Sequence, residues 1–284
     1  MEIKLENIES FIHLLNKTDI QINNLTWIEP FGIAMLKSFV NLNGIDVNLN
    51  NCKSSVEGYL KAILKAKDIN DTASYLFQEI SNLNNEEVAS FIVNKLLEKI
   101  PQDSDKEDIR KYLNYMITEM LDNVISHSNS KGYNYIVAQY YPTLRKIQIA
   151  IVDTGIGFLN SLRAMHNPQN EQEAILKALE KEITGSNKFD AYGIQKHAGL
   201  GLYFLKRIVN ETKGNLVIIS NDTIYSNFLN GEDKIETIEN SEWKGSVIVF
   251  EFFIDNLDYE WEQIRKLIQN EVYSDEEEEV EFLF

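Results

Sequence analysis

The chain is poor in cysteine, in long apolar runs and in basic residues. Among 284 residues Cys52 is the one cysteine, so an intramolecular disulfide is excluded, and such usage is typical of a reducing compartment. No apolar run approaches the ~18 residues of a membrane-spanning helix. Residues 1–6 lack the basic and apolar segments of a signal peptide. We therefore expect a cytoplasmic protein that does not interact with a membrane.

The shortage of basic residues limits the partners that this chain can bind. Lys and Arg number 27 against 44 Asp and Glu, which gives a formal net charge of −17. A nucleic-acid backbone requires a surface rich in Lys and Arg, so no direct binding to nucleic acid is expected. A nucleotide is not excluded, because Mg²⁺ or a local basic cluster offsets the global charge at a single site.

Residues 1–75 alternate between strand-like and helix-like segments. The expected order is strand 20–22, helix 31–39 opened by Pro30, strand 44–49 and a helix beginning at 55–60. This order predicts a small α/β domain over residues 1–75. The polar segment 67–72 is expected to be a linker to the rest of the chain.

Residues 85–256 have the pattern of a larger α/β domain. The expected elements are helices from residue 85 and over 106–127, 171–181 and 202–209, and strands over 135–140, 147–152, 216–220 and 246–253. Hairpin-like and helix-separated strands together predict a mixed sheet with helices on one face, that is, a two-layer sandwich. Residues 257–284 are expected to form a helix and an acidic tail.

The acidic tail permits two interpretations. Residues 274–281 are mostly Asp and Glu, and Phe282, Leu283 and Phe284 follow them. A solvated, disordered tail is typical of such a charge block. The alternative is an acidic docking peptide whose apolar end inserts into a protein partner.

Three short motifs suggest a site for a phosphate-containing ligand. Glu119 and Asn123 are four residues apart on a predicted helix, so they share one face, where a carboxylate can activate water and an amide oxygen can coordinate Mg²⁺. Asp153 follows a predicted strand and precedes Gly155 and Gly157, which permit close approach of a ligand to the backbone.

The third motif is a glycine pair at the start of a predicted helix. Gly199 and Gly201 precede residues 202–209, where free backbone N–H groups and the helix dipole favour a phosphate. The P-loop and the dinucleotide fingerprint are both absent from the sequence.

The order and spacing of these motifs over residues 85–255 resemble the GHKL superfamily of gyrase, heat-shock chaperone, histidine kinase and mismatch-repair ATPases. The resemblance implies a histidine-kinase-like ATPase sandwich that holds ATP and Mg²⁺, with Glu119 as the catalytic residue. It also implies a lid over about residues 158–198. The implied cofactor-binding residues are Asn123 (also the Mg²⁺ ligand), Asp153, Gly155, Gly157, Lys188, Lys196, Gly199, Leu200, Gly201, Leu202 and Ser246.

The sequence departs from the histidine-kinase members of this superfamily. Ser126 stands where they usually carry Lys, and none of His13, His127, His166 and His197 lies in a phosphoacceptor box. We therefore do not expect autophosphorylation on histidine. His127 is interpreted as a packing or hydrogen-bonding residue at the helix end rather than as a proton shuttle.

The run of residues 119–128 resembles cytoplasmic ATP-binding proteins related to anti-sigma-factor kinases most, and residues 25–36 are similar to a segment of anti-sigma antagonist (STAS-like) domains. Three functions remain open: ATP hydrolysis, phosphoryl transfer to a Ser or Thr of a protein partner, and a nucleotide-gated interaction module with little turnover. A homodimer is also left open.

Overall fold

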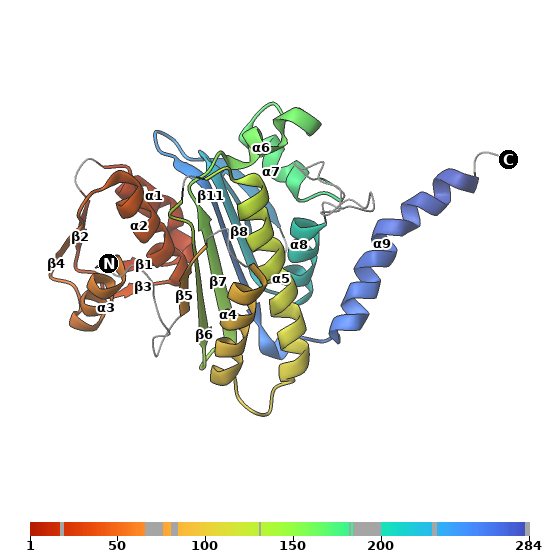
Figure 1. The fold of residues 1–284 in the computed structure, drawn as a ribbon, viewed down its shortest axis with the longest axis horizontal. Helices are drawn as coiled ribbons and strands as arrows, with labels where there is room; N and C mark the ends of the chain where they lie inside the picture. Colours follow the sequence, from red (N-terminus) through yellow and green to blue (C-terminus); the bar gives the residue numbers. More distant parts are fainter. Residues whose placement is uncertain are drawn as a thin grey trace.

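A seven-stranded sheet lies at the centre of the computed structural model (Figure 1). The structure describes residues 1–17, 20–65, 76–80, 85–130, 132–181, 183, 200–228 and 232–281. The strand order is β10-β9-β8-β11-β7-β6-β5. The strands are β5 (Leu76–Glu79), β6 (Tyr135–Tyr141), β7 (Lys146–Asp153), β8 (Asn215–Asn221), β9 (Thr223–Asn227), β10 (Asp233–Thr237) and β11 (Trp243–Phe253).

The expectation of a mixed α/β fold is confirmed, but the prediction of a mixed sheet is wrong for this sheet, which is antiparallel throughout. Helices connect β7 to β8, and the two strands run in the same direction. However, β11 lies between them and pairs antiparallel with both. The last strand of the sheet therefore separates the two strands that a helical crossover would otherwise have paired.

Helices α4 (Asn85–Lys99), α5 (Lys106–His127) and α8 (Gly201–Glu211) cover one face of the sheet. The bounds of α5 match the prediction: Asp105 caps its start by accepting from the N–H groups of Glu107 and Asp108, each at 3.1 Å. The helix buries its apolar stripe in the core of this layer. The stripe consists of Ile109, Leu113, Met116, Ile117, Met120 and Leu121.

Three further helices follow strands of the sheet in the chain. α6 (Gly157–His166) and α7 (Glu171–Ala178) follow β7, and α9 (Trp261–Glu281) follows β11 and projects from the body (Figure 1). The backbone expected to be a disordered tail is helical up to Glu281, as a Glu-rich run allows. Residues 282–284 lie outside the described residues, as does the expected linker 67–72. Among the described residues, no helix is long and apolar enough to cross a membrane.

The N-terminal elements combine helices with two short pairs of strands in a small α/β unit. Its helices are α1 (Ile8–Leu15), α2 (Pro30–Asn43) and α3 (Ser54–Lys65); β1 (Glu2–Ile3) pairs with β3 (Trp27–Ile28), and β2 (Gln21–Asn23) pairs with β4 (Asn48–Asn50). Both pairs are parallel. Pro30 occupies the first position of α2, where its missing N–H removes no helical hydrogen bond.

Helix α2 covers the face of the sheet opposite to α4 and α5. It packs on β6 and β7, and its apolar residues share one core with the sheet residues Val137, Ala150, Val152, Val217 and Val249. Helices were expected on one face only, whereas both faces of the central strands are buried. The near-continuous apolar run of β7 is typical of a strand covered on both sides.

A buried polar network joins the N-terminal unit to the sheet. The Gln148 side-chain amide donates to Glu29 at 3.1 Å and to Glu251 at 2.6 Å. Lys146 forms an ion pair with Glu251 at 2.6 Å, and the Asn215 amide donates to the same carboxylate at 2.5 Å. Burial raises the pKa of Glu29, and its hydrogen bond from Gln148 opposes that rise. The buried ionisable groups of Glu29, Lys146 and Glu251 are therefore stabilised by hydrogen bonds within the sheet and between the sheet and the N-terminal unit.

We expect Lys146→Met to lower the free energy of unfolding by about 3 kcal/mol, because Glu251 then stays buried without its ion-pair partner. Urea unfolding at pH 7 measures the change. Adding Glu251→Gln should restore part of the loss. The exposed Lys234→Met is the matched control, with an expected change within about 0.5 kcal/mol. Equal effects of Lys146→Met and Lys234→Met would contradict the role of the network.

Candidate functional site

The side chain of Glu119 lies against the first residue of α8. A Cβ atom on Gly201 would be 2.6 Å from Glu119 Oε2 and 3.3 Å from Glu119 Cβ, so a larger residue at this position would displace the Glu119 carboxylate. The half-buried Glu119 carboxylate makes no hydrogen bond or ion pair with any residue in the described part of the chain. Two motifs that are 82 positions apart in the sequence therefore meet at one carboxylate.

The environment of Glu119 changes its acidity. Burial, together with the nearby charge of Asp122, raises the pKa of Glu119 to about 7. An unpaired carboxyl group with such a pKa costs stability at neutral pH, and groups of this kind cluster at functional sites. At pH 7 both protonation states are populated, as general acid–base chemistry requires.

The start of α8 presents backbone donors without a side-chain cap. Leu200 is the N-cap residue and no side chain accepts a hydrogen bond there. The first intrahelical bond runs from the Phe204 N–H to the Leu200 carbonyl at 2.8 Å, so the preceding N–H groups have no acceptor within the helix. The Leu202 side chain is buried in the core, so Leu202 can contribute only its backbone to a site at the start of α8. The arrangement is typical of an anion site.

Asn123 lies one turn beyond Glu119 on α5. Its amide nitrogen is 4.0 Å from the sulfur of Met120. Its amide oxygen accepts no hydrogen bond from the described residues. A half-buried amide oxygen without a donor is chemically suited to a hard cation. Within the described residues, however, no group of three or more His, Cys, Asp or Glu is arranged to hold a metal ion.

Asp153 ends β7 and is buried opposite Ser246 of β11. The Gly155 N–H donates to Oδ1 at 2.8 Å, and the Ser246 hydroxyl donates to Oδ2. Burial raises the pKa of Asp153 to about 6, although hydrogen bonds from Ser246 and Gly155 oppose the shift. The carboxylate is therefore mostly ionised at pH 7 and acts as an acceptor.

The turn after Asp153 is fastened to the end of α5. The Ile156 N–H donates to the Ser128 carbonyl at 2.8 Å, and a Cβ atom on Gly155 would be 2.0 Å from the same oxygen. Glu119 and Ser128 are nine positions apart, which corresponds to about 13.5 Å along the helix. Along α5, Glu119 and the Asp153 turn are therefore separated by a distance on the scale of a nucleoside triphosphate.

Gly157 fastens the same turn to β8. Its φ of +73° favours glycine, and a Cβ atom there would be 2.3 Å from the Asn221 amide nitrogen. The Phe158 N–H donates to the Ser220 hydroxyl at 2.8 Å, which in turn donates to Glu171 at 2.7 Å. Gly157 thus serves the protein's own packing. No motif in the sequence identifies Glu171 as a partner of this turn.

Trp243 and Gly245 support Asp153 from β11, and sequence reasoning assigned no role to Trp243. The Trp243 indole N–H donates to the Asp153 carbonyl at 3.0 Å. A Cβ atom on Gly245, where φ is +120°, would be 2.3 Å from that carbonyl oxygen. The only signal in the sequence that could have identified Trp243 is its place two positions before Gly245, in a predicted late strand.

The structure thus brings together the residues Glu119 and Gly201, Asp153 and Ser246, and Gly155 with the end of α5. Three of the expected residues, Lys188, Lys196 and Gly199, lie outside the described residues, as does the side chain of His127. Residues 182 and 184–198 of the expected lid over 158–198 also lie outside the described residues, and the first part of that range contains α6 and α7.

Comparison with models of known protein families gives no match for this chain. A search of curated proteins also gives no significant match.

We expect Glu119→Gln to raise the free energy of unfolding by about 2 kcal/mol at pH 8, because the wild type must bury an ionised carboxylate there. The folded-state pKa of about 7 exceeds the ordinary value of 4.5, so the wild type loses stability as pH rises from about 4.5 through 7. The gain from the substitution should therefore be small at pH 4.5.

Urea unfolding at pH 4.5 and pH 8 tests this expectation, with the exposed Glu239→Gln as the control. A gain for Glu119→Gln that is the same at both pH values would show that the carboxylate does not titrate as described.

Proposed function

We propose that this chain binds Mg²⁺ and ATP along α5, between the Asp153 turn and the start of α8. The bound ATP is hydrolysed, or its phosphoryl group is transferred to a protein partner. The observation that carries the proposal is the unpaired, half-buried Glu119 carboxylate against the uncapped start of α8. A carboxylate at the positive end of a helix suits a site where a phosphate and an attacking oxygen meet.

The adenine end of the ligand is assigned to Asp153. An ionised carboxylate offers about four acceptor positions. Hydrogen bonds from the Gly155 N–H and from the hydroxyl and N–H of Ser246 use three of them. One acceptor position remains for an exocyclic amino group. Adenine carries that donor, whereas guanine has a carbonyl oxygen at the corresponding position.

The phosphate end is assigned to α5 and α8. The N–H groups at the start of α8 bind phosphate oxygens, and Asn123 offers its amide oxygen to Mg²⁺. One protein ligand is chemically sufficient, because Mg²⁺ usually keeps several waters and binds substrate phosphates. The bound metal neutralises charge on the phosphates. The N–H groups and the amide oxygen are of the chemical kind that phosphate and Mg²⁺ require. Lys188, Lys196 and Gly199 are proposed to complete the site.

Glu119 is proposed as the catalytic base. With a pKa of about 7 it accepts a proton near physiological pH from an attacking water, or from a Ser or Thr hydroxyl of a partner protein. The products are then phosphate or a phosphoprotein. Because no phosphoacceptor histidine box is present, autophosphorylation on histidine stays outside the proposal.

We also propose that residues 85–256 form a histidine-kinase-like ATPase domain of the GHKL superfamily, that the N-terminal unit is STAS-like, and that the protein is cytoplasmic. The meeting of the three sequence motifs at α5 supports the first assignment. The layer of α4, α5 and α8 on one face of the sheet also supports it. The N-terminal unit on the other face would be the additional module.

A nucleotide-gated interaction module is the second candidate. The N-terminal unit contacts the site region directly, since the Ser38 hydroxyl of α2 donates to the Tyr133 carbonyl at 2.8 Å. At the other end, Arg207 of α8 forms an ion pair with Glu271 of α9 at 2.7 Å. Nucleotide bound at α8 therefore has two physical routes to elements that a partner can reach.

We expect calorimetric titration at pH 7.5 with Mg²⁺ to show binding of ATP in preference to GTP. Asp153→Asn should weaken ATP binding at least about tenfold and reduce the preference, because an amide offers a donor as well as an acceptor. The exposed Asp258→Asn is the matched control and should bind like the wild type. Equal binding of ATP and GTP by the wild type and by Asp153→Asn would contradict the adenine assignment.

Glu119→Gln should keep ATP binding and lose about 10²-fold or more in phosphate release, since it retains shape but cannot take a proton. Labelled ATP added with candidate partner proteins separates transfer from hydrolysis. Unchanged turnover in Glu119→Gln would exclude Glu119 as the base. Tight binding with no turnover in the wild type, together with nucleotide-dependent capture of a partner, would favour the gated module.

A further inference from the structure

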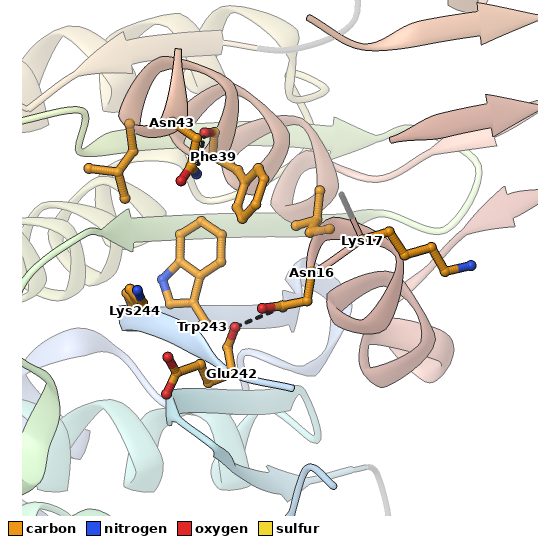
Figure 2. Close-up of a pocket in the computed structure, with 9 residues that line it drawn as sticks. Asn16, Lys17, Phe39, Asn43, Glu242, Trp243 and Lys244 are labelled. Atoms are coloured by element: carbon orange, nitrogen blue, oxygen red, sulfur yellow. Dashed lines mark hydrogen bonds between the residues drawn. The ribbon is translucent and has the colours of Figure 1, made fainter. Parts of the chain in front are cut away.

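A crevice of about 180 Å³ lies between the N-terminal unit and the start of β11 (Figure 2). It is lined by the ends of α1 and α2 and by residues 242–244. Leu15 and Trp243 are buried, and Figure 2 shows the Phe39 ring on the helix side near the Trp243 indole. The other lining residues are Asn16, Lys17, Leu42, Asn43, Glu242 and Lys244, all of them exposed.

The size and lining of the crevice suit one aromatic ring. An apolar cavity of about 150 Å³ is known to hold benzene. The crevice is somewhat larger and offers the indole of Trp243 and the ring of Phe39 as aromatic surfaces. Aromatic groups pair favourably in offset or edge-to-face arrangements with such rings.

The rim carries a net positive charge in a strongly acidic chain. Lys17, Lys244 and Glu242 each lack an ion pair or side-chain hydrogen bond to the described residues. Figure 2 shows Lys17 extending away from Trp243, whereas Lys244 lies beside the indole. Lys244 therefore offers an ammonium group to a ligand on the indole, and Lys17 adds positive charge at the outer edge of the rim, so a ligand with a single negative charge is favoured. The Glu242 carboxylate disfavours a second negative charge.

The floor of the crevice is connected to Asp153. The Trp243 indole N–H donates to the Asp153 carbonyl at 3.0 Å, in the turn that also presents the Asp153 carboxylate. Asn16 of the N-terminal unit donates to the Glu242 carbonyl at 2.9 Å, so the wall of the crevice is also bonded to this strand (Figure 2). A ligand that holds the indole therefore restrains the Asp153 turn.

We infer that this crevice is a binding site for a small monoanionic aromatic molecule, such as an aromatic carboxylate, and that its occupancy is linked to the Asp153 site. The ring lies on Trp243 and Phe39, and the anionic group faces Lys244 at the rim. The linkage rests on the proposed nucleotide site, whereas binding of the aromatic anion does not.

The first experiment measures binding of 4-fluorobenzoate to the full chain by ¹⁹F NMR without nucleotide. We expect saturable binding. Leu42→Trp, which narrows the mouth, should weaken it about tenfold. Lys244→Gln should weaken it about two- to fivefold, the effect of one exposed ion pair. Lys266→Gln, on the exposed side of α9, is the matched control and should have no effect.

Charge and shape are checked separately. Fluorobenzene and 4-fluorobenzylamine, which lack the negative charge, should bind more weakly than 4-fluorobenzoate. Leu42→Ala keeps the mouth open and should retain binding, which guards against misfolding of Leu42→Trp. No saturable binding of 4-fluorobenzoate, or binding that is equal in the wild type, Leu42→Trp and Lys244→Gln, would overturn the site.

The second experiment repeats the titration with saturating Mg²⁺ and ATP. We expect the affinity for 4-fluorobenzoate to change about fivefold, and ATP affinity to change by the same factor when 4-fluorobenzoate is present. Trp243→Phe keeps an aromatic floor but removes the donor to Asp153, so it should bind 4-fluorobenzoate and lose the linkage.

The two failures are distinguishable. Unchanged affinity in a protein that does bind ATP overturns the linkage. A protein that binds no ATP overturns the proposed function instead, and the first experiment still decides whether the crevice is a site.

Discussion

The position of β11 between β7 and β8 is the constraint on which the rest of the structure depends. Pairing with β7 places Ser246 opposite Asp153, so that a carboxylate can be buried with a hydroxyl donor. The same register puts Trp243 and Gly245 against the Asp153 carbonyl. A shift of one residue would turn each of these side chains to the other face of the sheet. The site is thus specified by strand register.

Helix α5 then holds the two ends of the candidate site at a fixed separation. Its C-terminal end bonds to the turn after Asp153, and Glu119 meets the start of α8. Neither Glu119 nor Asp153 lies in an environment that favours its charge, since burial raises both pKa values. A protein selected for stability alone would not keep an unpaired carboxylate there. A local loss of stability at residues that rigid helices and strands hold in place is typical of functional sites.

Local sequence patterns predicted the helices well and the sheet poorly. The cap at Asp105 and the apolar stripe of α5 are local features, so the sequence predicted the bounds of that helix. The order of strands depends on contacts between distant segments, and nothing near β11 indicates that it separates β7 from β8. The sequence predicted close approach of a ligand at the glycines. At Gly155 and Gly157 the approaching group is the protein's own backbone or side chain.

The second covered face of the sheet changes how the N-terminal unit should be understood. A separate domain on a linker would influence the candidate site only when it docks, whereas α2 shares a core with β6 and β7. The polar network of Glu29, Gln148 and Glu251 crosses the same boundary, and breaking it would leave charges buried without partners. The N-terminal unit is therefore in direct contact with the strands that carry Asp153 and Trp243. Any ligand or partner that acts on this unit acts on a support of the site, because α2 packs directly on β6 and β7.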